Sequence, residues 1–519
     1  MSHRIPTSSS PVRRRRVRLG LLAIGATTIA TLIAARPAEA GSYVTTQCSP
    51  ADQGAGAVWE RTSEDYRERR RCGSGDGLQV YQDGGATLRG RYGAWVWRAP
   101  AGTIFSSLKA NASLTNDAGH HGELWATRTS GSRTEFGNEH RDFRVHQLAG
   151  SFTRLEAMLR CVAANGCGRA ADDSAHAYVK GVFIRVEDQT APTVQLEGGS
   201  LLATPVVRGV ETLSFEASDR GGGVRRVSVA ANGTELASDV RNCELADGFA
   251  TALVPCSRAT SGTWSVDTAH AAFTTGPNAV AACAADLALD GSANRDCERR
   301  RVWVDNVCPA SSEPGARLTA RFASGGNRTV VRSDRTPTIE GRVLDANGSA
   351  VTGATVCVLT RVERAGSPVL LTATARSRDG GHYRLELSPG ASRDVFVHHV
   401  AGSNVIARHG LRLGSRVRPT FAVRPPAGAS NGDRLRFEGR LPGPGCSRRI
   451  VKVQANVGDD HWQVFRTDRT NGRCRFGARY RLRATTGRTT YRFRALVPPQ
   501  AGYPYERGNS AVRKVTASG

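Results

Sequence analysis

The stretch RCRFGARYRLRATTGRTTYRFRAL, residues 473–496, decides the fold class because apolar and basic residues alternate along it. From Cys474 to Ala484 every second residue is apolar or aromatic, and the positions between them are arginines and one glycine. A period of two is typical of a β-strand with one buried face. The alternation resumes at Tyr491 after a short Thr/Gly segment, which predicts a β-hairpin. A disordered basic tail would lack this pattern and its aromatic residues.

The outer face of this predicted hairpin is strongly basic, and arginine pairs bidentately with phosphate and carboxylate groups. We therefore expect weak binding of anionic polymers, such as cell-wall polymers or acidic polysaccharide, and no sequence-specific nucleic-acid binding. The alternative is a solvated face with no ligand. The expected contacts are Arg475, Arg479, Arg481, Arg483, Arg492 and Arg494.

The positive charge is concentrated in the C-terminal part of the chain. Residues 310–519 contain 36 basic and 14 acidic residues, a net +22, whereas residues 41–309 contain 28 basic and 31 acidic residues, a net −3. The basic character is therefore a property of one region, and the predicted hairpin lies inside it.

The first 40 residues have the pattern of an export signal. An arginine cluster at 13–18 precedes the apolar run LGLLAIGATTIATLIAA, and Ala38-Glu39-Ala40 matches a cleavage site. We expect a secreted, extracellular or cell-wall-associated protein that starts at Gly41 and has no membrane span after cleavage. The alternative is an uncleaved membrane anchor, although the run is near the lower limit for a span.

Twelve cysteines follow this signal, an even number that favours disulfides in an exported protein. Pairing of neighbours leaves Cys308 and Cys357 over, and these two are candidates for a sixth pair whose state stays open. No C-x-x-C and no zinc-finger spacing occurs, and we expect no metal and no cofactor. The pairs suggested by sequence order are Cys48–Cys72, Cys161–Cys167, Cys243–Cys256, Cys283–Cys297 and Cys446–Cys474.

Short alternating runs separated by Gly, Asn, Asp and Pro recur along the chain, and no capped amphipathic helix stands out. This pattern predicts an all-β protein built from tandem β-sandwiches. Breaks near 191, 310 and 416 divide the chain after the signal peptide (1–40) into four parts of sandwich size, 41–190, 191–309, 310–415 and 416–519.

All four parts resemble known extracellular modules. Residues 337–359, PTIEGRVLDANGSAVTGATVCVL, with TARSRDGGHYRLEL at 374–387, resemble the carboxypeptidase regulatory-like, prealbumin-type sandwich. In residues 191–309, Leu213, Phe215 and Ala217 alternate with polar residues, and the strand VRRVSVAA precedes an Asn232-Gly233 turn; in residues 416–519, VKVQANV and WQVFRTD precede Asn471-Gly472. Both segments resemble bacterial Ig-like domains. The resemblance implies a secreted bacterial multi-domain protein whose modules are non-catalytic.

The first part, residues 41–190, resembles the jelly-roll sandwiches that often head such proteins, many of which bind sugars. Aromatic faces suit stacking against pyranose rings. We therefore consider carbohydrate stacking by Trp95, Trp97 and Trp125, against the alternative that these side chains fill the sandwich core.

A zinc hydrolase is the third interpretation. The run GHHGELW, residues 119–125, resembles the zinc-binding stretch of metallocarboxypeptidases, which implies His120 and Glu123 as ligands. The third ligand would be His140, His146 or His176. The segment lacks the helix–strand alternation of that catalytic domain, so we expect no enzyme. A calcium or zinc cluster of Glu139, His140, Asp142 and His146 is the alternative to solvated strand residues, which we expect here and also at the doublet His398-His399.

Taken together, these patterns predict a non-catalytic structural or adhesive binding protein of the cell envelope or extracellular space. Carbohydrate binding by the N-terminal sandwich is the alternative function.

Overall fold

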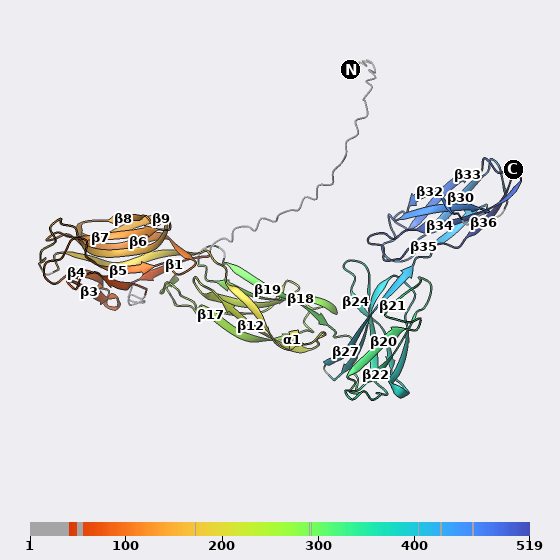
Figure 1. The fold of residues 1–519 in the computed structure, drawn as a ribbon, viewed down its shortest axis with the longest axis horizontal. Coiled ribbons are helices and arrows are strands. Elements are labelled where there is room, and N and C mark those ends of the chain that lie inside the picture. Colours follow the sequence, from red (N-terminus) through yellow and green to blue (C-terminus); the bar gives the residue numbers. More distant parts are fainter. Residues whose placement is uncertain are drawn as a thin grey trace, which may run out of the picture. The chain divides into compact units, whose positions relative to one another are not determined.

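The computed structural model describes residues 41–519 except 49–55, 172, 290, 292, 403, 426–427 and 459–460. The expected signal peptide lies outside the described residues. Almost all regular structure in the described part of the chain is β, arranged in several separate sheets, so the all-β prediction is confirmed (Figure 1). No helix among these residues has the length and apolar character needed to cross a membrane.

The N-terminal strands form one connected 12-stranded sheet around a core that includes the side chains of Tyr43, Trp95 and Phe105. The first half of β9 pairs with β6, and its second half pairs with β5 and β7. The strands are β1 (Gly41–Gln47), β2 (Val58–Arg61), β3 (Tyr66–Arg71), β4 (Gly77–Gln82), β5 (Tyr92–Arg98), β6 (Thr103–Thr115), β7 (His120–Arg128), β8 (Arg133–Gly137), β9 (His140–Cys161) and β10 (His176–Asp188), joined by β15 (Leu245–Ala246) and β16 (Phe249–Ala250).

The last two strands of that sheet come from the segment that follows it in sequence. β16 adds to β1 through Thr45 and Ala250, and Leu253 and Leu287 join the same core. The remaining strands of this segment form a three-stranded and a four-stranded sheet. These are β11 (Thr193–Gly198), β12 (Val210–Ser218) and β17 (Ala259–Asp267), then β13 (Val224–Ala231), β14 (Thr234–Val240), β18 (Gly276–Asp286) and β19 (Arg295–Val304), with one short helix, α1 (Ser200–Ala203).

The next strands form a three-stranded sheet, β20-β22-β25, and a five-stranded sheet, β21-β27-β26-β23-β24, over a common core. Tyr383 of β25 is buried in this core, and its hydroxyl donates to the carbonyl of Thr319 (2.6 Å). The strands are β20 (Arg317–Phe322), β21 (Arg328–Arg332), β22 (Thr338–Leu344), β23 (Thr355–Val362), β24 (Val369–Arg376), β25 (His382–Glu386), β26 (Arg393–Ala401) and β27 (Asn404–Arg416).

The C-terminal sandwich, formed by strands β28 to β36, has the same division into a three-stranded sheet, β28-β30-β33, and a larger sheet, β29-β36-β34-β31-β32 with β35 on β34. Phe437 and Phe493 meet between the two sheets, with ring centroids 4.9 Å apart. The strands are β28 (Thr420–Arg424), β29 (Ala429–Ser430), β30 (Arg434–Arg440), β31 (Ile450–Val457), β32 (Gln463–Arg469), β33 (Arg475–Arg481), β34 (Arg488–Val497), β35 (Gly508–Asn509) and β36 (Arg513–Ser518).

The prediction that residues 473–496 form a β-hairpin is wrong. β33 pairs with β30, whereas β34 pairs with β31 and β36, so residues 482–487 cross from one sheet to the other. The alternation specified a buried face on each strand, and Phe476 and Phe493 do enter the same core. They enter it from opposite sheets, because periodicity does not specify which strand lies beside which.

Six disulfides are present, and five of them join the neighbours suggested by sequence order. The sixth joins Cys308 to Cys357, with Cα atoms 5.8 Å apart. This disulfide links the segment after β19 to β23. Six disulfides fit an oxidising compartment outside the cytosol.

Candidate anion-binding face

The solvent side of the sheet β28-β30-β33 carries seven arginines and one carboxylate. Inward residues such as Leu435 and Phe437 are buried, so the residues between them point outward. We call this surface the arginine face. Its charged members, all exposed, are Arg424, Arg434, Arg436, Glu438, Arg440, Arg475, Arg479 and Arg481.

The register places arginines directly opposite one another on this face. Arg434 faces Arg481, Arg436 faces Arg479, and Arg440 faces Arg475. Directly opposite residues of an antiparallel pair have Cβ atoms about 4.5–5.5 Å apart on the same side of the sheet. Three like-charged pairs therefore lie in a row.

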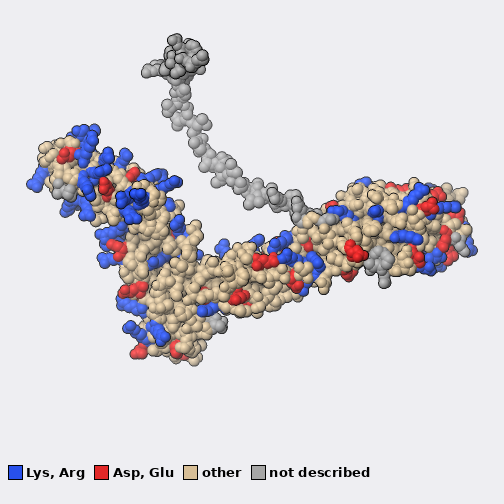
Figure 2. Space-filling model, turned by 180° about the vertical axis from the view of Figure 1, so that it is seen from behind, with Lys and Arg blue, Asp and Glu red and all other residues tan. Residues whose placement is uncertain are grey.

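Few of these guanidinium groups have a partner in the described part of the chain. Arg436 forms an ion pair with Glu438 (3.2 Å), and Arg481 donates to the carbonyl oxygen of Gly432 (3.1 Å). The other five arginines form no ion pair or side-chain hydrogen bond with the described residues. Figure 2 shows the same imbalance, with basic side chains gathered over the C-terminal sandwich and both signs mixed over the N-terminal one.

The structure brings together only half of the arginines predicted from the sequence. Arg475, Arg479 and Arg481 belong to the arginine face, and Arg483 lies just beyond the end of β33. Arg492 and Arg494 lie on the other sheet. Arg494 also packs on Trp462, with its guanidinium carbon 3.9 Å from a ring centroid, and donates to Gln454 (2.8 Å).

Four arginines of this face were missed. Arg434, Arg436 and Arg440 come from RLRFEGR, which alternates in the same way as residues 473–483, and Arg424 ends TFAVR. The alternation could have identified these strands. Their position beside β33 depends on the sheet order, which no local pattern gives.

The preceding sandwich has an equivalent sheet, because Glu-Gly-Arg occurs at the same place in the central strand of each (340–342 and 438–440). Gly341 pairs with Tyr383, and Gly439 pairs with Phe476. A Cβ at either glycine would overlap that aromatic side chain and a backbone carbonyl of the first strand. In both sheets, therefore, an aromatic side chain packs closely against a glycine of the central strand.

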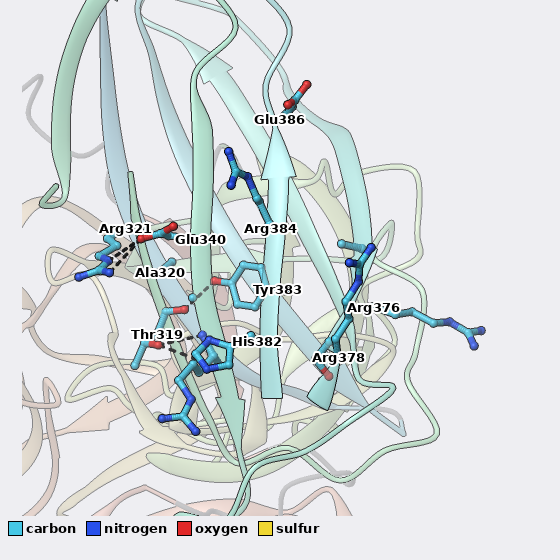
Figure 3. A pocket seen from close by; sticks show the side chains of 14 residues that line it. Thr319, Ala320, Arg321, Glu340, Arg376, Arg378, His382, Tyr383, Arg384 and Glu386 are labelled. Atoms are coloured by element: carbon cyan, nitrogen blue, oxygen red, sulfur yellow. Dashed lines mark hydrogen bonds and ion pairs between the residues drawn. The ribbon is translucent and has the colours of Figure 1, made fainter. Parts of the chain in front are cut away.

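A hollow of about 1210 Å³ lies over this equivalent sheet, β20-β22-β25 (Figure 3). Arg376, Arg378 and Arg384 line it and form no ion pair with described residues. Arg321 is neutralised by Glu340 (2.9 Å). This surface is basic but less uniform than the arginine face.

The tryptophans proposed for sugar stacking are not available for it. Trp95 and Trp97 are 2% and 0% exposed and belong to the core, so that prediction is wrong for both. Trp125 is half-buried. Its indole N–H donates to Glu123 (2.6 Å), and Arg133 covers its ring at 4.8 Å from a centroid. The core-packing alternative explains these residues.

The metallocarboxypeptidase-like arrangement is also contradicted. His120 is fully buried, and its ring nitrogens contact the hydroxyl of Tyr66 and the carbonyl of Gly168, both at 3.0 Å. Burial lowers the pKa of His120, which favours a neutral ring. Glu123 is held by Arg160 (3.0 Å). Both proposed ligands are thus occupied by structural contacts.

The other histidines make separate contacts. His140 and His146 stack on each other with ring centroids 4.7 Å apart, whereas His176 contacts Ser113 (2.9 Å). The expectation that His398 and His399 lie on the surface is wrong, because both are fully buried in β26. Glu139 and Asp142 are exposed, as expected.

Comparison with known proteins adds no assignment. A scan against models of protein families finds no match to this chain, and a search of curated proteins finds none either.

Proposed function

We propose that this is an exported, non-catalytic binding protein of the cell envelope or extracellular space, which holds anionic polymers on the arginine face. Teichoic acid and acidic polysaccharide are the ligand classes that fit a site outside the cell. The six disulfides support the location, since such bonds persist in oxidising compartments.

The observation that carries this proposal is the row of facing arginine pairs on β30 and β33. Like charges directly opposite each other destabilise a sheet. An oxyanion between two guanidinium groups removes that repulsion and accepts charge-assisted hydrogen bonds from both. Only one carboxylate, Glu438, lies among the seven arginines, so the chain itself does not balance the charge.

The face is suited to an extended polymer rather than a single small anion. Strands lie about 4.7–4.9 Å apart, and alternate residues along a strand repeat at about 6.6 Å. The arginines thus form a fixed grid along which successive phosphate or carboxylate groups can bind. Because such contacts release counterions, binding should weaken steeply with salt.

The direct test is a binding titration of the intact protein with fluorescent teichoic acid and fluorescent heparin, with dextran as the uncharged control. We expect both anionic polymers to bind at low salt and to dissociate as salt is raised, and dextran not to bind. Equal binding of dextran, or no binding of either anionic polymer at low salt, would contradict the proposal.

A further inference from the structure

Three buried carboxylates lie where the 12-stranded sheet meets the sheets that follow it. Asp188 is the last residue of β10, Asp219 follows β12, and Asp286 is the last residue of β18. Their side chains are 0%, 5% and 1% exposed. Asn294, just before β19, is 2% exposed and joins them.

Hydrogen bonds to side chains and to the backbone bring these groups together. The Asn294 amide donates both to Asp286 Oδ2 and to the carbonyl of Asp188, each at 2.7 Å. Gly41 of β1 pairs with Asp188 of β10. Gly41 also lies close to Asp286, because a Cβ added to this glycine would be 2.9 Å from both carboxylate oxygens of Asp286. The N–H of Gly222 donates to Asp188 Oδ2 (2.7 Å).

Three oxygens in this cluster have no hydrogen-bond donor among the described residues, although all are buried. They are Asp219 Oδ1, Asp286 Oδ1 and Asn294 Oδ1. The second oxygen of Asp219 accepts from the Gly223 N–H (2.7 Å), and that of Asp286 accepts from Asn294, so these two carboxylates are satisfied on one side only. Asp188 accepts at both oxygens, from Thr190 and from Gly222. A buried polar atom without a partner is destabilising, and such groups in native proteins require an explanation.

The negative charge is also uncompensated. None of the three carboxylates forms an ion pair with any described residue. Buried charges are normally paired or bind a metal.

We propose that Asp188, Asp219, Asp286 and Asn294 form a calcium site at this junction. All the available donors are oxygens, which hard cations prefer. Calcium accepts six to eight oxygens in flexible geometry, whereas magnesium requires a near-ideal octahedron. The donorless oxygens of Asp219, Asp286 and Asn294 supply part of this shell.

In the present side-chain conformations, no group of three His, Cys, Asp or Glu residues in the described ranges is close enough together to bind a metal ion. The cation must therefore draw the carboxylates inward by side-chain rotation, and backbone carbonyls and water complete its shell. Because the ligands lie at the ends of β10, β12 and β18, the bound ion would link the N-terminal sheet to the sheets after it.

The test is thermal unfolding of the intact, disulfide-bonded protein in EDTA and in millimolar calcium chloride, with calorimetric titration of calcium. We expect calcium to raise the melting temperature by at least about 3 °C. Asp219→Asn and Asp286→Asn keep the side-chain shape and should each abolish the rise. Asp296→Asn, an exposed neighbour with the same change in charge, should keep it.

Two results would overturn the site. One is the absence of both a calcium-dependent shift and measurable heat of binding in the parent. The other is an undiminished shift in both Asp219→Asn and Asp286→Asn, which would place the ion elsewhere. A more stable Asp286→Asn variant that no longer responds to calcium supports the site, since that change removes the repulsion that calcium relieves.

Discussion

Arg436 of β30 and Arg479 of β33 face each other on the solvent side of the same sheet, and neither is opposed by an acidic residue across these two strands. They are 43 positions apart in the sequence. The pairs Arg434–Arg481 and Arg440–Arg475 extend the row. This arrangement gives the C-terminal sandwich a surface on which seven arginines are opposed by one carboxylate, Glu438, and the proposed function rests on this surface.

Removing one charge from the row should stabilise the protein when no ligand is present. For Arg479→Gln we expect a gain of up to about 1 kcal/mol at low salt, because a facing repulsion is lost. The gain should disappear at high salt, where exposed charges are screened. Chemical denaturation checks this, with Arg473→Gln as the control outside the sheet. A loss of stability specific to Arg479→Gln would count against repulsion across the sheet.

Gly439 is required for packing on the inner side of the same sheet. A Cβ at this position would overlap the Phe476 ring and the carbonyl of Thr420, so Gly439→Ala should destabilise the sandwich by about 1–3 kcal/mol. Gly472→Ala, where an added Cβ meets nothing within 4 Å, is the matched control. Hydrogen–deuterium exchange of residues 420–519 should accelerate in the first variant alone; equal exchange in both would refute the close packing.

Asp305 and His398 form a fully buried pair, with Oδ2 and Nδ1 2.6 Å apart. Burial alone would raise the pKa of Asp305, but the hydrogen bond and charge of His398, with two backbone N–H groups, outweigh it and lower the pKa. Because the pKa of Asp305 is lowered in the folded protein, its carboxylate contributes its full stabilisation at any pH above the ordinary pKa of a carboxyl group. This stabilisation is lost as the pH falls through the folded-state pKa.

Asp305→Asn should therefore destabilise the protein by about 3 kcal/mol at pH 7. Its difference from the parent should shrink in acid, below about pH 4, where the parent carboxylate also takes up a proton. Denaturant titrations from pH 3 to pH 8 measure this, with the exposed Asp379→Asn as control. A difference that does not change with pH would show that the carboxylate charge contributes nothing.

The Cys446–Cys474 disulfide spans 28 positions and joins the segment before β31 to the start of β33. Closing a loop of this length restricts the unfolded chain by about 3 kcal/mol in the chain-entropy account. The double variant Cys446→Ser and Cys474→Ser should lose about this much stability in calorimetry. Peptide mapping of the parent is the accompanying check, and two free thiols there would contradict the bridge.

The sequence predicted the fold class because side-chain periodicity is a local property. Alternation at 473–483 and at 491–495 correctly marks β33 and β34, and Phe476 and Phe493 are buried as their parity requires. Strand order is set by tertiary packing, and a crossing at residues 482–487 looks in the sequence like a hairpin turn. The candidate site was therefore only half identified.

A second group of wrong predictions concerns side chains that were expected to be exposed and are buried. Trp95 and Trp97 lie in the core, and His398 is buried because Asp305, 93 positions away, pairs with it. The sequence contains no metal-binding motif at Asp188, Asp219 and Asp286, because these residues lie at the ends of three separate strands. Contacts at such separations leave no local pattern.

The central claim is that the arginine face itself, rather than net charge, holds the polymer. The most direct measurement compares two triple variants on teichoic-acid and heparin resins. The first carries Arg436→Glu, Arg475→Glu and Arg479→Glu. The second carries Arg488→Glu, Arg492→Glu and Lys514→Glu, which make the same charge change on exposed residues of the other sheet. We predict that the first variant elutes at much lower salt, with the slope of log affinity against log salt reduced by about 3, while the second stays close to the parent. Equal losses in the two variants, or no loss in the first, would contradict the account.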